Sequence, residues 1–141
     1  MEKKDKDLLL KDLCARLPYG VKCQFEDTIE INKEIWFCED EGWQVDGEKT
    51  STCIHAVKPY LFPLSSMTKE QYEEWCDLEA NPLDEILTRN ANGEKMSTLE
   101  HHLLIAKSLT DAVNYCYKKH FDIYGLIPMG LAIDATSKNI Y

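Results

Sequence analysis

The chain has 141 residues, of which 44% are hydrophobic and 29% are charged, and its formal net charge is −9. This length fits one ordinary domain, and this composition is typical of a globular protein and not of a disordered one. Because phosphate groups attract lysine and arginine, the acidic balance disfavours direct binding to nucleic acid or to an anionic membrane surface. We therefore expect a single globular domain over residues 1–141 that binds neither.

The first segment expected to be regular is a helix over residues 4–17. Leucines recur there at helical spacing, and Pro18 stops the pattern. Before it, charged residues leave no uninterrupted apolar stretch of the kind that a secretory signal needs. No run approaches the roughly 18–20 apolar residues of a membrane-spanning helix. These features predict a cytoplasmic protein with free thiols, and we expect Cys14, Cys23 and Cys116 to be mostly buried.

Between residues 19 and 57 the apolar period changes to two. Short alternating runs follow one another with short connections, and Asp46-Gly47 has the sequence of a tight hairpin turn. This pattern predicts an antiparallel meander of four or five strands with one face in water.

Acidic residues gather in two blocks, residues 26–48 and residues 70–85. A solvated sheet face explains the first block, and we prefer that interpretation. The alternative is a docking surface that imitates the backbone of a nucleic acid. The acidic face would then include Glu26, Glu30, Glu34 and Asp40.

Three helices are expected after a proline-containing connector at residues 58–66. Thr68 and Gln71 form a capping box for the first, which should reach about Leu78. Asn81-Pro82 marks the start of a short second helix, because asparagine is a good cap and proline suits the first helical position.

Ser97 and Glu100 form a second capping box, which opens a third helix. Its apolar residues step by three or four, which is typical of a helix that buries one face. They are Leu99, Leu103, Ala106, Leu109, Val113 and Cys116. The predicted fold is therefore α+β, with an N-terminal helix, a meander sheet, and three helices packed on one face of the sheet.

Residues 121–133 are expected to form an apolar, turn-rich strap whose only charge is Asp122. Two destinations are open. The strap closes over the core against Leu103, Ala106 and Val113, or it forms an exposed patch that meets a partner or a second copy. We prefer the first, because folded monomers rarely expose large apolar patches. The candidate interaction residues on the second are Phe121, Tyr124, Leu126 and Met129.

Patterns for metal binding and catalysis are sparse. The closest two cysteines are nine residues apart and there is no H-E-x-x-H motif, so we predict neither a metal nor a cofactor. If the third helix continues that far, Cys116 and His120 could meet, with Asp122 nearby, and activate a thiolate. We prefer the interpretation in which Cys116 ends the apolar stripe and His120 is a surface residue at the helix end.

Three segments carry a recognisable pattern. Residues 13–21 read LCARLPYGV, residues 58–68 read KPYLFPLSSMT, and residues 120–132 read HFDIYGLIPMGLA, with NIY at positions 139–141. Together they resemble a group of small uncharacterised proteins found in gut Bacteroidetes and their phages. The resemblance spans most of the chain and is least clear over residues 27–50 and 76–98.

This resemblance implies a bacterial cytoplasmic or phage-encoded accessory protein and assigns no activity, cofactor or catalytic residue. Members of the group carry a basic residue where this chain has Phe62 and Tyr124, so no role of that base is carried over.

The small size, the acidic surface and the lack of a catalytic motif favour a non-enzymatic accessory or interaction protein. A protein partner or self-association is then expected. The alternatives are an acidic nucleic-acid mimic that inhibits a DNA-binding protein and a small enzyme that uses the Cys/His pair.

Overall fold

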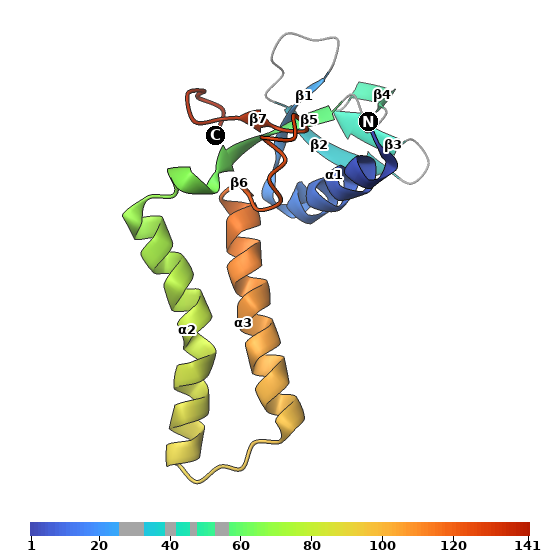
Figure 1. The fold of residues 1–141 in the computed structure, drawn as a ribbon. Helices are drawn as coiled ribbons and strands as arrows, with labels where there is room; N and C mark the ends of the chain where they lie inside the picture. The colour runs from blue at the N-terminus through green and yellow to red at the C-terminus, as the bar shows by residue number, and fades with distance from the viewer. Residues whose placement is uncertain (26–32, 39–41, 46–47, 53–56) are drawn as a thin grey trace. The chain divides into compact units, whose positions relative to one another are not determined.

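The computed structural model describes residues 1–25, 33–38, 42–45, 48–52 and 57–141 (Figure 1). Residues 25, 33–38, 42–45, 48–52 and 79–83 are described by their backbone alone. The chain divides into two compact units. Met1–Ser66 and Tyr117–Tyr141 form the α/β unit, and Met67–Cys116 form the hairpin. Helices and strands occur together, which confirms the α+β class.

The α/β unit begins with helix α1, Lys3–Arg16, which matches the helix predicted over residues 4–17. A short 3-10 turn, Leu17–Tyr19, follows, and Pro18 lies at its start, where a missing N–H leaves no hydrogen bond unmade. Gly20 has a φ of 66°. Glycine adopts this left-handed conformation without steric cost, so the chain can turn there toward the first strand.

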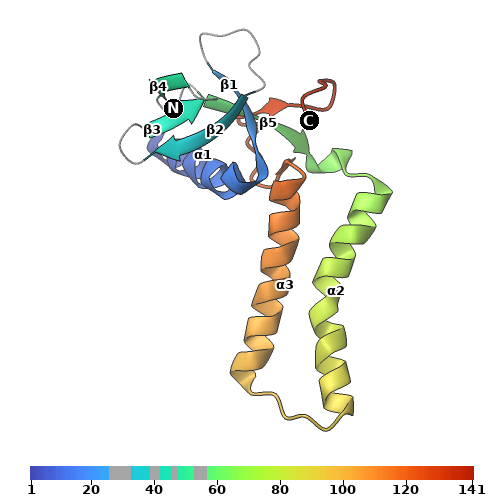
Figure 2. The same ribbon diagram turned by 180° about the vertical axis from the view of Figure 1, so that it is seen from behind.

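The described strands of this unit belong to one sheet, with the order β4-β3-β2-β1-β5-β6 and with β7 paired to β5 (Figure 2). They are β1 (Lys22–Phe25), β2 (Lys33–Cys38), β3 (Gly42–Val45), β4 (Glu48–Thr52), β5 (Val57–Pro63), β6 (Phe121–Asp122) and β7 (Ile133–Asp134). Strands β1 to β4 pair antiparallel in chain order, and β1 also pairs antiparallel with β5. The predicted meander is confirmed in this part of the sheet.

The sheet as a whole is mixed, so the prediction of a purely antiparallel meander is wrong. Strand β5, which fills most of the expected connector, pairs parallel with both β6 and β7. Parallel neighbours need a crossover connection, and residues 64–120 supply it between β5 and β6. An alternating pattern within residues 19–57 cannot reveal such partners, because they lie far along the chain.

The strap closes over a core formed with α1 and the sheet. Leu126 is fully buried there, as the preferred interpretation of the strap requires. Its buried neighbours in that cluster are Leu9, Leu13, Val21, Cys23, Val57, Leu61, Leu131 and Ala132. The expected neighbours were wrong, because Leu103 and Val113 are 59% and 42% exposed. A helical stripe shows that a face is apolar, but it does not show what covers that face.

The hairpin consists of helix α2, Lys69–Ala91, and of helix α3, Thr98–Lys118, up to Cys116, and the last two residues of α3 belong to the α/β unit. Helix α2 begins at the predicted capping box, in which Thr68 and Gln71 each accept a hydrogen bond from the other's backbone N–H. Ser97 and Glu100 form the same reciprocal pair at the start of α3. Both predicted capping boxes are confirmed.

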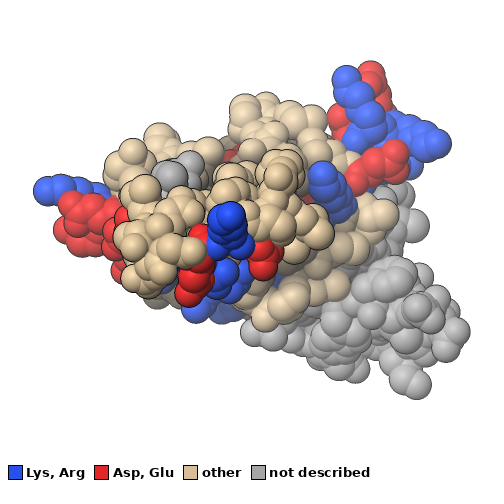
Figure 3. All heavy atoms as spheres, turned by 90° about the horizontal axis from the view of Figure 1, so that it is seen from below, with Lys and Arg blue, Asp and Glu red and all other residues tan. Residues whose placement is uncertain are grey.

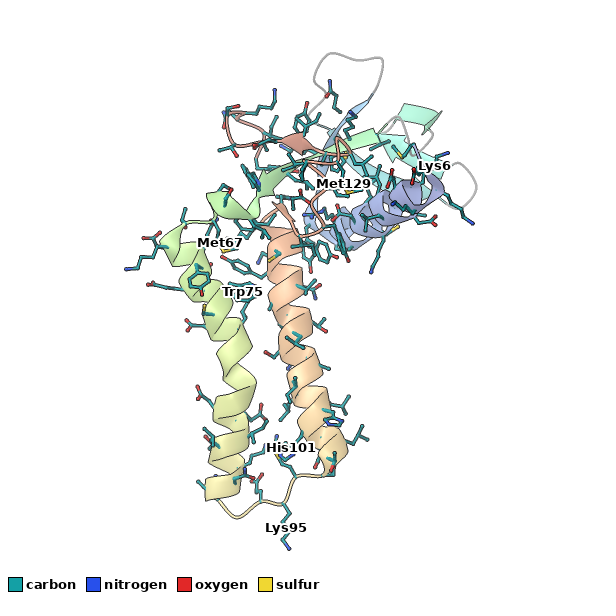
Figure 4. The ribbon with its side chains drawn as sticks, viewed as in Figure 1. Lys6, Met67, Trp75, Lys95, His101 and Met129 are labelled. Carbon is teal, nitrogen blue, oxygen red and sulfur yellow. The ribbon has the colours of Figure 1, made fainter. Side chains whose placement is uncertain are left out.

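The short second helix predicted to start at Asn81-Pro82 does not exist separately, because α2 continues through this dipeptide. Proline inside a helix has no N–H for the carbonyl four residues earlier, which here belongs to Leu78. The Ser108 hydroxyl of α3 donates to that carbonyl at 2.9 Å. Nearby, Trp75 points toward α3 (Figure 4), and its indole N–H donates to the Ala112 carbonyl. Tertiary contacts thus satisfy a backbone group that the sequence alone leaves open.

We predict that Ser108→Ala destabilises the protein by about 1 kcal/mol, because the Leu78 carbonyl loses its donor. In a Pro82→Ala background the same change should cost less, since residue 82 then offers its own helical N–H. Urea unfolding followed by circular dichroism measures both costs.

The control is Thr110→Ala, which removes an exposed hydroxyl that bonds the Ala106 carbonyl one turn earlier in the same helix. An equal cost of Ser108→Ala in both backgrounds would contradict this account of Pro82.

Candidate functional site

Asp12 and Arg16, one turn apart on α1, form an ion pair in which both side chains are fully buried. Arg16 Nε and Nη2 donate to the two carboxylate oxygens of Asp12 at 2.7 and 2.9 Å. Nη2 also donates to the carbonyl oxygen of Phe121 at 2.6 Å. The guanidinium carbon lies 5.0 Å from the centroid of the Tyr117 ring. Arg16 therefore joins α1 to β6 and to the residue that follows the hairpin.

The charges of this pair are enclosed by protein. Burial raises the pKa of the Asp12 carboxyl, and the hydrogen bond and positive charge of Arg16 oppose that shift. Arg16 Nη1 is buried without a hydrogen-bond partner among the described residues. A fully buried pair offers no surface to a substrate, so we assign it a structural role. Sequence reasoning missed it, although Asp12 and Arg16 stand four residues apart beside the leucine stripe.

Asp122, the only charge in the strap, folds the strap back on itself. Its two carboxylate oxygens accept hydrogen bonds from the backbone N–H groups of Leu126 and Ile127, at 2.8 and 2.9 Å. The side chain is 6% exposed. Its oxygens are thus engaged in holding the turn that places Leu126 in the core.

The Tyr141 side chain extends the hydrogen-bonded ladder between β1 and β5. Its hydroxyl accepts from the backbone N–H of Lys22 at 3.1 Å and donates to the carbonyl of Tyr60 at 2.9 Å. Continuing the β1–β5 register by one residue places Lys22 opposite Tyr60. The hydroxyl therefore bridges two backbone groups that would otherwise face each other across the ladder.

His120 stacks on the Tyr141 ring, with the ring centroids 3.7 Å apart and the planes 12° from parallel. The side chain is 8% exposed, so the expectation of a surface residue is wrong. Burial and the positive charges of Arg16 and Lys22 lower the pKa of His120 to about 4. The imidazole is therefore neutral at physiological pH and packs as a flat, uncharged ring.

Cys116 and His120, the proposed Cys/His pair, do not lie on one continuous helix. Cys116 lies on α3, which ends at Lys118. His120 has a φ of 62°, which is left-handed, so helical spacing does not continue from Cys116 to His120. Asp122 bonds the strap backbone. The catalytic interpretation required α3 to continue as far as His120, and α3 ends before that residue.

The candidate interaction residues divide by burial. Phe121 and Leu126 are 2% and 0% exposed, and the Tyr124 hydroxyl lies 3.2 Å from that of Tyr117. Met129 is 44% exposed; it is labelled in Figure 4. The proposed acidic face lies outside the description, which omits Glu26, Glu30 and Asp40 and the side chain of Glu34. On the face drawn in Figure 3, the described acidic and basic side chains are interspersed.

Among the described cysteines, Cys14, Cys23 and Cys76 are free thiols. Cys23 and Cys116 are buried as predicted, but Cys14 is exposed, contrary to expectation. Burial raises the pKa of the Cys23 thiol, which makes it a poor nucleophile. Within the described part of the chain, no three metal-ligating side chains gather to hold a metal ion.

The hairpin carries a broad apolar surface in contact with water. We call it the hairpin face and define it by its large exposed side chains, each at least 42% exposed. They are Tyr72 and Leu87 on α2, and Leu99, Leu103, Ile105, Leu109 and Val113 on α3. Folded monomers rarely leave apolar patches of more than a few hundred Å² uncovered, so this surface is the candidate functional site.

The side of α3 that contacts α2 differs from the side that carries the apolar stripe. Ser108 and Tyr115 bond α2 at Leu78 and Glu74. At about 3.6 residues per turn, Leu99, Leu103 and Val113 fall on the far side of α3 from Ser108. The stripe that the sequence predicted as core-facing is therefore free of α2.

Tyr72 and Leu87 of α2 extend the hairpin face beyond α3. Trp75 contacts α3 and Ser108 contacts α2, so each marks the contact side of its own helix. Rotation about the helix axis from Trp75 leads to Tyr72 and Leu87 on α2. Rotation in the same sense from Ser108 leads to Ile105 and Leu109 on α3. In an antiparallel helix pair, equal rotations from the contact line lead to the same side. The hairpin face therefore includes both helices.

The other side of the hairpin is polar. Glu85, Glu100, Lys107 and Asp111 fall there by the same count, and all four are exposed. Glu85 pairs with Arg89 at 2.7 Å. Helix α3 is thus amphipathic, with charge on one side and apolar side chains on the other, whereas α2 also carries the exposed pair Lys69 and Glu73 on the flank of Tyr72 and Leu87.

No family model, curated protein or solved structure matches this chain. Among the described residues, no helix has the length and apolar character needed to span a membrane.

We predict that Arg16→Met destabilises the protein by about 3–5 kcal/mol, because it leaves the buried Asp12 carboxylate without its partner. The double variant Asp12→Leu/Arg16→Met should recover much of this loss, since no buried charge remains. Thermal unfolding of both variants tests the role of the pair, and a single variant as stable as the parent would contradict it.

We also predict that acid weakens the fold through His120. Its pKa falls from an ordinary 6.5 to about 4 on folding, so the folded state resists protonation. Stability from this group is complete above pH 6.5 and is lost as pH falls from 6.5 toward 4. Urea unfolding at pH 7, 6, 5 and 4 measures the slope.

His120→Asn is the control, because asparagine does not titrate and tolerates a left-handed backbone. The variant should lose part of the slope. An unchanged slope would contradict the assignment to His120.

Proposed function

We propose that this protein is a non-enzymatic interaction protein and that the hairpin face is its contact surface. One observation carries the proposal. Leu99, Leu103 and Leu109 are 66%, 59% and 52% exposed although they belong to the most regular apolar stripe of the chain. A helix keeps such a stripe when something covers it, because apolar area in water is unfavourable by roughly 25 cal/mol per Å².

The chemistry of the α/β unit supports a binding role over an enzymatic one. Its buried polar groups, Asp12, Arg16 and Asp122, hydrogen-bond one another or the backbone. The thiol of Cys23 and the imidazole of His120 are enclosed, and both are held in their neutral forms. These groups fasten the strap to the core, and the unit serves as the scaffold for the hairpin.

Two further aspects belong to the proposal. The resemblance of residues 58–68 and 120–132 to proteins of gut Bacteroidetes and their phages supports an accessory role in a bacterial cytoplasm. The acidic mimic stays a prediction, since the carboxylates on which it rests lie outside the described residues.

Photo-cross-linking tests the proposal. A benzophenone amino acid at Leu103 in the full chain, produced in its native cells, should give cross-linked products, because the hairpin face is covered there. The same amino acid at Asp111, which is exposed on the polar side of α3, is the matched control and should give few. No product at Leu103, or equal products at both positions, would contradict a contact surface at the hairpin face.

A further inference from the structure

The hairpin face needs a cover that is itself apolar, elongated and of similar size. Its side chains extend from Leu99 to Val113 on α3 and from Tyr72 to Leu87 on α2. The two helices have 23 and 21 residues. Helices that are hydrophobic on one side bury that side against another layer of helices or against a sheet.

We propose, building on the interaction function above, that the hairpin face binds the hairpin face of a second copy. The two hairpins then form a four-helix bundle, the arrangement in which antiparallel helices share a core of side chains. A two-fold axis relates the copies, so each residue of one face meets the corresponding region of the other.

The size of the hairpin face fits this partner. At 1.5 Å per residue the stretches from Leu99 to Val113 and from Tyr72 to Leu87 are each about 22 Å long, and two helices side by side are about 20 Å wide. The face therefore offers roughly 450 Å² of planar area, more than half of the roughly 800 Å² that each partner buries in a standard interface. Side-chain relief adds to the planar value, so a second hairpin is large enough to bury the whole face.

The charge distribution also permits self-association. Two chains of net charge −9 repel each other unless the charges stay away from the contact. The α3 part of the face, which carries Leu99, Ala106 and Val113, has no Asp, Glu, Lys or Arg at helical positions between these residues. Glu100, Lys107 and Asp111 fall on the polar side instead. On α2 the same count places Lys69 and Glu73 on the flank of Tyr72 and Leu87, and these opposite charges pair at 3.8 Å and offset each other there.

Sedimentation equilibrium of the full chain over a wide concentration range tests the proposal. The parent should dimerise, and Leu109→Glu should weaken dimerisation at least tenfold, because each copy then brings a charge into the interface. Leu109 is 52% exposed, so this change should leave the fold intact, which circular dichroism checks. Lys107→Gln is the matched control, since it makes the chain more negative by the same one charge at an exposed position on the polar side of α3 and should leave dimerisation unchanged.

A parent that stays monomeric, or a dimer that Leu109→Glu leaves as tight as before, would overturn the proposal. This result is distinct from a failure of the interaction function. If Leu103 cross-links to a different protein and the parent is monomeric, the proposed self-association is wrong but the interaction function stands. If no cross-link forms, both proposals are wrong. Cross-links to another copy of this chain support both.

Discussion

The guanidinium group of Arg16 connects parts of the α/β unit that the chain itself keeps far apart. It holds Asp12 on its own helix, the Phe121 carbonyl at the start of the strap, and the ring of Tyr117. A buried charge is costly unless hydrogen bonds surround it, so these partners must stay together for the unit to fold. The position of β6, and through it the path of the strap, depends on this one side chain.

Two further contacts complete the attachment of the C-terminal segment. Asp122 turns the strap so that Leu126 enters the core, and the Tyr141 hydroxyl bridges the backbones of β1 and β5. His120 packs against the Tyr141 ring as a neutral imidazole. These polar side chains thus stabilise the fold of the α/β unit.

The hairpin satisfies its internal polar groups and leaves its apolar side open. Ser108 bonds the Leu78 carbonyl that Pro82 cannot bond, and Trp75 bonds the Ala112 carbonyl. These contacts use one line of α3 and leave the stripe of Leu99 and Leu103 uncovered. We propose a second hairpin as its cover because the length and width of such a hairpin match those of the exposed side.

The sequence by itself determined the local elements. Helix α1, the two capping boxes and the antiparallel pairs of β1 to β4 follow from periodicity, caps and turns, which act between residues close in the chain. Only the tertiary structure decided that β5 pairs parallel with β6, that α2 continues through Pro82, and that Arg16 and His120 are buried. These outcomes depend on partners tens of residues away, and no local pattern specifies which distant donor, charge or strand will arrive. The same reason explains why the stripe on α3 could be recognised while its exposure could not.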